Sequence, residues 1–198
     1  MEVLRLSNII RQHDEEINNF QQYSRRDCVE IAGLPVEPDE DTNALTIKVG
    51  SLMGVHIDEK DISISHRLPH KAQNETYSSR LRPREGGSTG VNSANRFPRI
   101  IVKFVRRSVK EQFYQGRKYL KDKSTKDIGL SRLSVNNIFI SESLSPRNKS
   151  LFKDCLKFKR DHSFRYIWTQ SGRIYLRKNK DLPAHVISST QDLEALSR

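Results

Sequence analysis

The sequence has few cysteines, no zinc-ligand spacing and no long apolar run. Its two cysteines, Cys28 and Cys155, are far apart and form no CxxC pair, so we expect reduced intracellular thiols and neither a disulfide framework nor a zinc site. The first residues reach Arg11 and then DEE without an apolar stretch of membrane-spanning length. We therefore expect no signal peptide, no transmembrane segment and a cytoplasmic or nuclear location.

Signatures of catalysis are missing as well. The six histidines are scattered, and no GxSxG, HExxH, P-loop or GxGxxG run occurs. No spacing of acidic residues suggests the carboxylate cluster that a nuclease would need. We predict a non-enzymatic protein with no cofactor, no metal and no small-molecule substrate.

Positive charge, in contrast, is abundant and unevenly distributed. Residues 1–68 carry 7 Lys and Arg against 13 Asp and Glu, residues 69–97 carry 5 against 2, and residues 98–198 carry 23 against 9. A half this basic, with aromatic residues among its arginines, favours a polyanionic partner and nucleic acid above all. Acidic lipid or an acidic protein would meet the same charge.

A heptad pattern opens the chain. Its apolar positions and one histidine alternate at spacings of three and four, at Val3, Leu6, Ile10, His13, Ile17 and Phe20. This seam predicts a coiled coil over residues 1–23 that joins chains into a dimer or trimer, with His13 setting the register or responding to pH. The alternative is an amphipathic helix that packs on its own domain.

Residues 24–143 follow the order of elements of a ferredoxin-like domain, which is also that of RNA recognition motifs. We expect strands at residues 28–32, 62–68, 99–105 and 137–141, a helix from an N-cap at Thr42 to Met53, and a helix at residues 108–120. In this βαββαβ order both helices lie on one sheet face, and the other face would be open for a ligand. The polar segment 69–97 would be a disordered insertion, either a solvated linker or a segment that touches phosphates.

Residues 144–198 predict a small basic α+β domain with a helix, a β-hairpin and a short C-terminal helix. Ser145-Pro146 is typical of a helix start. The polar side of this helix carries six cations, Arg147, Lys149, Lys153, Lys157, Lys159 and Arg160. They form either a solvated face or contacts to one anionic partner, and with only Asp154 among them we favour the partner.

The predicted hairpin would turn at Ser171-Gly172. A two-residue turn places Tyr166, Trp168, Tyr175 and Arg177 on one face, with Arg173 diagonal to Tyr175. Such a face suits stacking with splayed bases. Trp168 and Tyr166 could instead complete a small core, because so small a domain needs large side chains inside.

The candidate nucleic-acid-binding residues are spread over these elements. They are Arg99, Lys103, Arg106, Arg107, Lys149, Lys153, Lys157, Arg160, Arg165, Tyr166, Trp168, Arg173, Tyr175, Arg177 and Lys178.

Four segments carry a family resemblance: RRDCVEIAGLP at residues 25–35, ISHRL at 64–68, PRIIVKF at 98–104 and WTQSGRI at 168–174. Together they resemble the baculovirus few-polyhedra (FP) protein family and the related RNA-binding proteins that the first open reading frame of LINE-type retrotransposons encodes. The resemblance covers roughly residues 20–190, in the same order of coiled coil, RRM-like domain and basic C-terminal domain. It implies an oligomeric chaperone that coats single-stranded nucleic acid in a retroelement or viral ribonucleoprotein.

The chain departs from RNA recognition motifs where these stack bases. Glu30 occupies the aromatic position of the first strand, and Arg99 and Ile101 occupy the stacking positions of the third. Binding would therefore depend more on phosphate contacts, with low sequence specificity. Arg99 could stack on a base or pair with Glu30 across the sheet.

The sequence leaves two functions open. The first is a chaperone of single-stranded RNA or DNA. The second is a structural adaptor whose coiled coil and sheet bind proteins and whose basic half meets a membrane surface or an acidic protein. Salt-sensitive binding to single strands distinguishes them.

Overall fold

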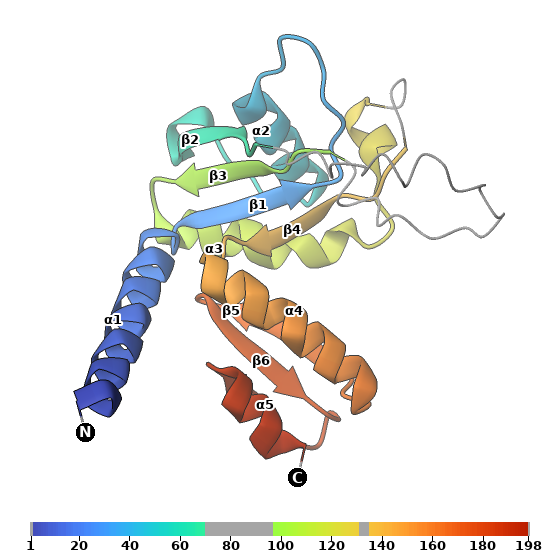
Figure 1. Ribbon diagram of the computed structural model, residues 1–198. Helices are drawn as coiled ribbons and strands as arrows, with labels where there is room; N and C mark the ends of the chain where they lie inside the picture. Colours follow the sequence, from blue (N-terminus) through green and yellow to red (C-terminus); the bar gives the residue numbers. More distant parts are fainter. Residues whose placement is uncertain (1, 70–96, 131–134, 198) are drawn as a thin grey trace, which may run out of the picture. The chain divides into compact units, whose positions relative to one another are not determined.

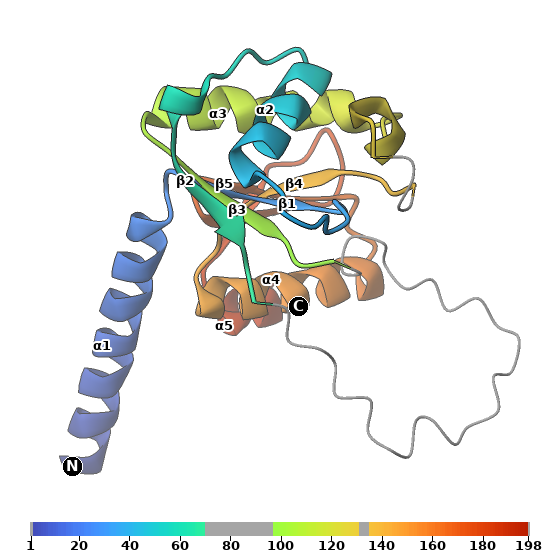
Figure 2. The same cartoon turned by 90° about the horizontal axis from the view of Figure 1, so that it is seen from above.

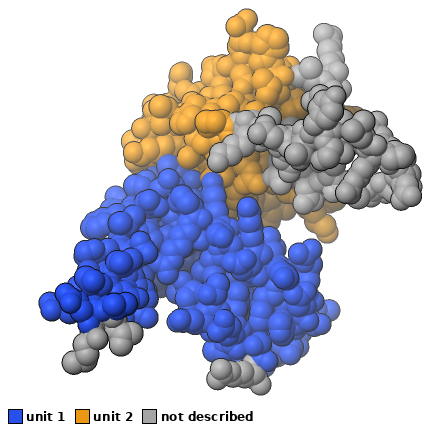
Figure 3. All heavy atoms as spheres, in the orientation of Figure 1, with its two compact units in different colours: residues 1–28, 142–198 blue, residues 29–141 orange. Residues whose placement is uncertain are grey.

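The computed structural model describes residues 2–69, 97–130 and 135–197, which form two compact units (Figures 1 and 3). One unit comprises residues 29–141, and the other joins residues 1–28 to residues 142–198. Nearly all of the predicted insertion at 69–97 lies outside the described residues. The three-domain division that the sequence suggests stays a prediction, whereas the structure groups the N-terminal helix with the C-terminal module.

The unit of residues 29–141 contains a four-stranded sheet in the order β2-β3-β1-β4. Its strands are β1 (Cys28–Ala32), β2 (Ile62–Arg67), β3 (Ile100–Phe104) and β4 (Phe139–Glu142). Helices α2 (Thr42–Leu52) and α3 (Arg107–Gly116) lie on the same side of this sheet (Figure 2). Short 3-10 turns follow at Glu59–Asp61, Arg117–Leu120 and Thr125–Ile128.

The core of this unit lies between the sheet and the two helices. Alternation along β3 buries Ile100, Val102 and Phe104, and the ring of Phe104 lies 5.2 Å from that of Phe113 on α3. Val49 of α2 is fully buried in the same cluster. The period of two in the strand and the helical spacing in α2 thus predict the core positions correctly.

The helix start in this unit differs from the prediction. Asp41, not Thr42, is the N-cap of α2, and its side chain accepts hydrogen bonds from the backbone amides of Asn43 (2.8 Å) and Ala44 (3.1 Å). The Thr42 hydroxyl lies 2.6 Å from that of Ser65 on β2. Both residue types cap helices well, and the neighbouring strand decides between them because it engages Thr42.

The second face of the sheet is not open along β1, so that expectation was wrong for this strand. Alternation points Cys28, Glu30 and Ala32 away from the helices, yet all three are buried, and Glu30 is only 1% exposed. Arg99 donates to the Glu30 carboxylate at 3.2 Å, which is the pairing that we weighed against base stacking. These three residues of β1 therefore leave little surface to a ligand.

Arg67, the last residue of β2, joins several segments at one end of the sheet through hydrogen bonds. Its guanidinium donates to both carboxylate oxygens of Glu40 (2.6 and 2.7 Å) and to the carbonyls of Leu34, Pro35 and Pro98. All five N–H donors of this side chain are therefore satisfied. The hydrogen bond from Arg67 holds the pKa of Glu40 below its usual range.

The second unit contains the N-terminal helix and the C-terminal module. Its elements are α1 (Glu2–Ser24), α4 (Pro146–Asp161), β5 (Tyr166–Gln170), β6 (Arg173–Arg177), β7 (His185–Ile187) and α5 (Thr190–Leu196). The predicted helix, hairpin and C-terminal helix are confirmed. Strand β7, which pairs antiparallel with β6, was not predicted, because three residues after Pro183 carry almost no alternation to detect.

Helix α1 keeps its heptad seam on the surface. Val3, Phe20, Ile10 and Ile17 are 78%, 75%, 62% and 54% exposed. The predicted helix is therefore present, and its seam does not pack on the rest of the described chain as the alternative supposed. No helix among the described residues has the length and apolar character to cross a membrane.

Overall, the protein is of the mixed α+β class, with an N-terminal helix and two antiparallel sheets.

Candidate nucleic-acid interface

The C-terminal module is built on α4. The Ser145 hydroxyl accepts from the Asn148 amide, and Pro146 occupies the first turn, as the Ser-Pro pair predicts. Leu151, Cys155 and Phe158 are buried on the inner side of the helix. Burial raises the pKa of the Cys155 thiol to about 11, so this cysteine is a packing residue and not a nucleophile.

The hairpin turns over two residues in the left-handed region. Ser171 and Gly172 have φ of 52° and 76°, the pattern of a type I′ turn, which matches the twist of antiparallel strands. Their backbone amides donate to the two carboxylate oxygens of Glu142, at 3.0 and 3.1 Å. Glu142 is buried, and no local pattern announces it, because it lies 29 and 30 residues before the turn.

The register of the hairpin confirms the predicted faces. Tyr166 is opposite Arg177, Trp168 is opposite Tyr175, and Gln170 is opposite Arg173. We call these three cross-strand pairs the aromatic–arginine ladder. The other face packs on α4 through its buried apolar residues, above all Ile174 and Leu176.

The ladder is stacked on itself. The rings of Trp168 and Tyr175 are nearly parallel, at 7°, with centroids 5.3 Å apart. The Arg177 guanidinium lies 5.0 Å from the centroid of Tyr166 and 5.7 Å from that of Trp168. These four side chains are half-buried. Trp168 thus lies on the outer face of the hairpin, opposite the core residues.

Arg177 carries a polar atom without a partner. Its Nε is buried, and no hydrogen-bond acceptor among the described residues reaches it. An unsatisfied buried donor destabilises a fold unless a ligand or water completes it. A phosphate oxygen is an acceptor that arginine binds well.

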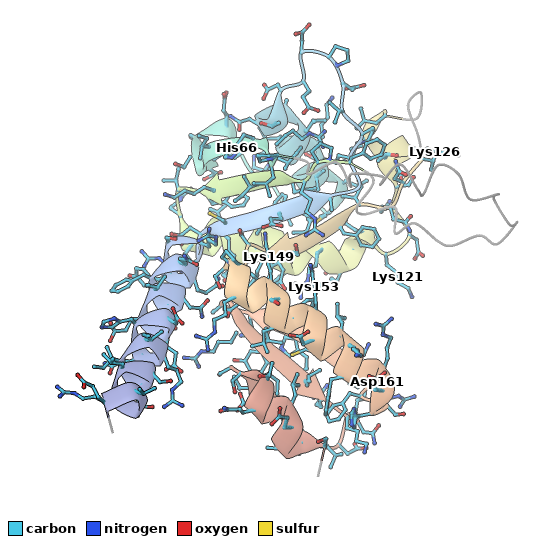
Figure 4. All side chains as sticks on the ribbon, viewed as in Figure 1. His66, Lys121, Lys126, Lys149, Lys153 and Asp161 are labelled. Atoms are coloured by element: carbon cyan, nitrogen blue, oxygen red, sulfur yellow. The ribbon has the colours of Figure 1, made fainter. Side chains whose placement is uncertain are left out.

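The cations of α4 form a separate group. Lys149, Lys153 and Arg160 lie on the side of the helix opposite its buried residues and are exposed; Figure 4 labels the two lysines on α4. Lys157 flanks them and is also exposed. Because the hairpin packs on the inner side of α4, these cations lie on the face of the module away from the ladder.

Two further candidates lie at the open end of the hairpin. Arg165 and Lys178 are exposed, and the Arg165 amide donates to the Lys178 carbonyl at 3.2 Å. They follow Tyr166 and Arg177 along the two strands, and because side chains alternate they belong to the hairpin face opposite the ladder. Val186 of β7, opposite Tyr175 and 45% exposed, adds an apolar side chain to the ladder face, and we missed it together with its strand.

The remaining candidates belong to the unit of residues 29–141. Lys103 is exposed on β3 opposite Ile64, and Arg107 is exposed at the first turn of α3. Arg99 pairs with Glu30, as above. Arg106 donates to Asp61 at 2.6 Å. The Asp58 backbone amide, which also donates to this carboxylate, and Arg106 hold its pKa below the usual range. Arg99 and Arg106 therefore have structural partners, of which the sequence suggested Glu30 as one alternative and gave no sign of Asp61.

The described residues contain no group of three or more His, Cys, Asp or Glu side chains placed to hold a metal ion.

The comparison with known families concerns the C-terminal module. Residues 145–197 match the family model described as Baculovirus FP protein domain 2. The matched segment begins at the N-cap of α4 and ends at the C-cap of α5, so it contains the whole module with its ladder. This similarity supports the resemblance to baculovirus FP proteins. No curated protein matches the chain.

Proposed function

We propose that this protein binds single-stranded nucleic acid without catalysis and acts as a chaperone, as a homo-oligomer that α1 assembles. In this proposal it coats RNA in a retroelement or viral ribonucleoprotein. The observation that carries the proposal is the aromatic–arginine ladder on the outer face of the hairpin, with Arg177 Nε, in the pair farthest from the turn, buried and without a partner among the described residues.

Chemistry supports single strands as the ligand. Unpaired bases expose their faces and edges to aromatic side chains and arginine, and each stacked base contributes ~1–3 kcal/mol. The Trp168 and Tyr175 rings stack on one another, so we assign them a base contact at their outer faces and edges. Arg177 and Arg173 would then bind the phosphates on either side.

Charge supports the same ligand. Residues 145–197 contain eleven Lys and Arg and five Asp and Glu. Basic groups on both the hairpin face and the α4 face would let one module bind a strand along more than one path, with little sequence preference. Low specificity is what a coating protein requires.

The exposed seam of α1 supports oligomerisation. Apolar residues at a and d positions are stabilised when a second helix covers them. Several modules on one assembly would bind a long strand with avidity.

The strand order β2-β3-β1-β4 and the sequence of elements support an RRM-like assignment for the unit of residues 29–141. The proposed relation to LINE-type proteins rests on this assignment and on the four segments that resemble them. In this proposal both this chain and those proteins lack the aromatic residue of the first strand that stacks bases in RNA recognition motifs, a position that Glu30 occupies here.

The test is binding to matched single-stranded RNA and DNA oligomers over a range of salt concentrations. With about five phosphates neutralised, log affinity should fall against log salt with a slope of roughly −3.5. Binding to neither oligomer, together with binding to acidic vesicles or acidic proteins, would instead establish the adaptor role.

A further inference from the structure

Two amide side chains near the end of α1 hold the C-terminal module. Gln22 Oε1 accepts from the Ser145 amide (3.0 Å) and from the Asn148 side chain (3.1 Å), and Gln22 Nε2 donates to the Ser143 carbonyl (3.1 Å). Asn18 accepts from the Ser145 hydroxyl at 2.6 Å and donates to Asn148 at 3.2 Å. We call these five residues the polar junction.

The polar junction also reaches the hairpin turn. Asn148 donates to the Gly172 carbonyl at 3.2 Å. The side chain of Gln22 lies so close to Gly172 that a Cβ there would come within 2.5 Å of it. The end of α1, the first turn of α4 and the tip of the ladder therefore meet at one place.

The polar junction and the seam occupy different sides of α1. Successive helical residues are rotated by about 100°, so Asn18 and Gln22 lie roughly 110° and 150° around the axis from the mean direction of the six seam residues. The seam residues Ile10 and Ile17 stay exposed while the junction is formed. One helix can therefore associate with another chain and carry the module at the same time.

We propose that Asn18 and Gln22 are positioning residues that make α1 and the C-terminal module one body. The junction would have the closed state of the structure and an open state; helix association that orders α1 and ligand binding that orders the ladder both favour the closed state, so each favours the other by the same factor. Helix association and ligand binding are the two events of the proposed function, on which this part of the inference rests. The proposal that α1 and the C-terminal module form one body does not depend on nucleic-acid binding.

The body is tested first by hydrogen exchange on the full chain without ligand. Gln22→Ala removes three hydrogen bonds of the polar junction and should speed exchange at least about tenfold at the Ser171 and Gly172 amides, since the loss of one hydrogen bond of ordinary strength already corresponds to about that factor. These amides bond to Glu142 and not to Gln22, so the effect must travel through the junction. Gln12→Ala, an exposed glutamine off the seam of the same helix, is the matched control and should leave both amides unchanged.

The reciprocal variant keeps the test decisive. Gly172→Ala places a methyl group against Gln22 and should speed exchange by a similar factor at the C-terminal turn of α1, about 150 residues away in sequence. The proposal is wrong if Gln22→Ala, like the Gln12→Ala control, leaves the exchange rates of the Ser171 and Gly172 amides unchanged. It is also wrong if Gly172→Ala leaves the exchange rates at the C-terminal turn of α1 unchanged.

The coupling is tested by sedimentation with an eight-nucleotide oligouridylate as the probe. The oligouridylate should lower the dissociation constant for self-association of the wild-type chain at least threefold and leave that of Gln22→Ala unchanged. Equal tightening in both proteins would overturn the coupling. If the oligouridylate does not bind the wild-type chain, the proposed function is wrong. The hydrogen-exchange results still decide whether α1 and the C-terminal module are one body.

Discussion

Trp168 lies flat against Tyr175 across the hairpin, with the ring planes 7° apart. Each ring therefore covers one face of the other, Arg177 lies 5.7 Å from the Trp168 centroid, and both side chains keep part of their surface exposed. The apolar residues that hold the hairpin to α4 lie on the opposite side of the strands. The outer-face position of Trp168 favours base contact over core packing, the two roles that the sequence allowed, because a residue on the outer face contributes less to folding than a core residue does.

Trp168→Ala should reduce affinity for a short single strand by ~1–3 kcal/mol and lower the melting temperature only slightly. Ile174→Ala, a core residue on the neighbouring strand, is the control and should cost ~2–5 kcal/mol of stability. Fluorescence anisotropy and thermal unfolding measure the two effects. A Trp168→Ala protein that unfolds like Ile174→Ala would make the tryptophan a packing residue.

Alanine substitutions of the two arginines of the ladder should differ in their effects on binding and on stability. Arg173 is exposed at the turn, so Arg173→Ala should reduce the salt slope by about 0.7 with an unchanged melting temperature. Arg177→Ala should reduce the slope similarly and also remove ring contacts that contribute ~0.5–1 kcal/mol. If both variants bind like the wild type, the strand runs elsewhere, and the exposed cations of α4 become the first residues to test.

Ile10→Asp combined with Ile17→Asp should convert oligomers into monomers, because both charges enter the seam. Binding to long strands should weaken far more than binding to short ones, since avidity is lost. Gln12→Asp with Asn19→Asp adds the same charges at the same spacing off the seam and should leave assembly intact. Sedimentation decides, and a wild-type chain that is already monomeric would refute the prediction.

Glu142→Gln should destabilise the hairpin by ~1–3 kcal/mol. The carboxylate accepts from two backbone amides, and an amide side chain would turn its NH2 group toward one of them, leaving a buried donor unpaired. Circular dichroism during thermal unfolding measures the change. Exchange should rise at the amide that faces the NH2 group, and unchanged exchange at both the Ser171 and Gly172 amides would contradict the arrangement.

Acid should destabilise the protein through Glu40. Its pKa is lowered in the folded chain by the hydrogen bond from Arg67, so its contribution is complete above the unfolded value of about 4.3 and is lost as pH falls through the lower folded value. Glu40→Gln should lower the melting temperature at neutral pH and approach the wild type at low pH. Glu59→Gln, an exposed carboxylate with the same change of charge, should show no such convergence.

Local patterns predicted much of the fold. The alternation in β3, the helical spacing in α2 and α4, and the two-residue turn at Ser171-Gly172 are all present, because each depends on residues within a few positions of one another. The faces of the hairpin followed from the same turn. The short strand β7 was missed because three residues carry too little pattern.

The sequence by itself determined the heptad helix, the basic hairpin and the absence of motifs for catalysis. Only the tertiary structure decided that Arg99 pairs with Glu30 and Arg106 with Asp61. It also decided that Glu142 accepts from the hairpin turn, and that Asn18 and Gln22 of α1 form hydrogen bonds with the C-terminal module. These pairings join residues tens to more than a hundred positions apart. Periodicity reports only which side of an element is apolar, whereas polar partners are chosen by which side chains the folded chain brings within hydrogen-bonding distance.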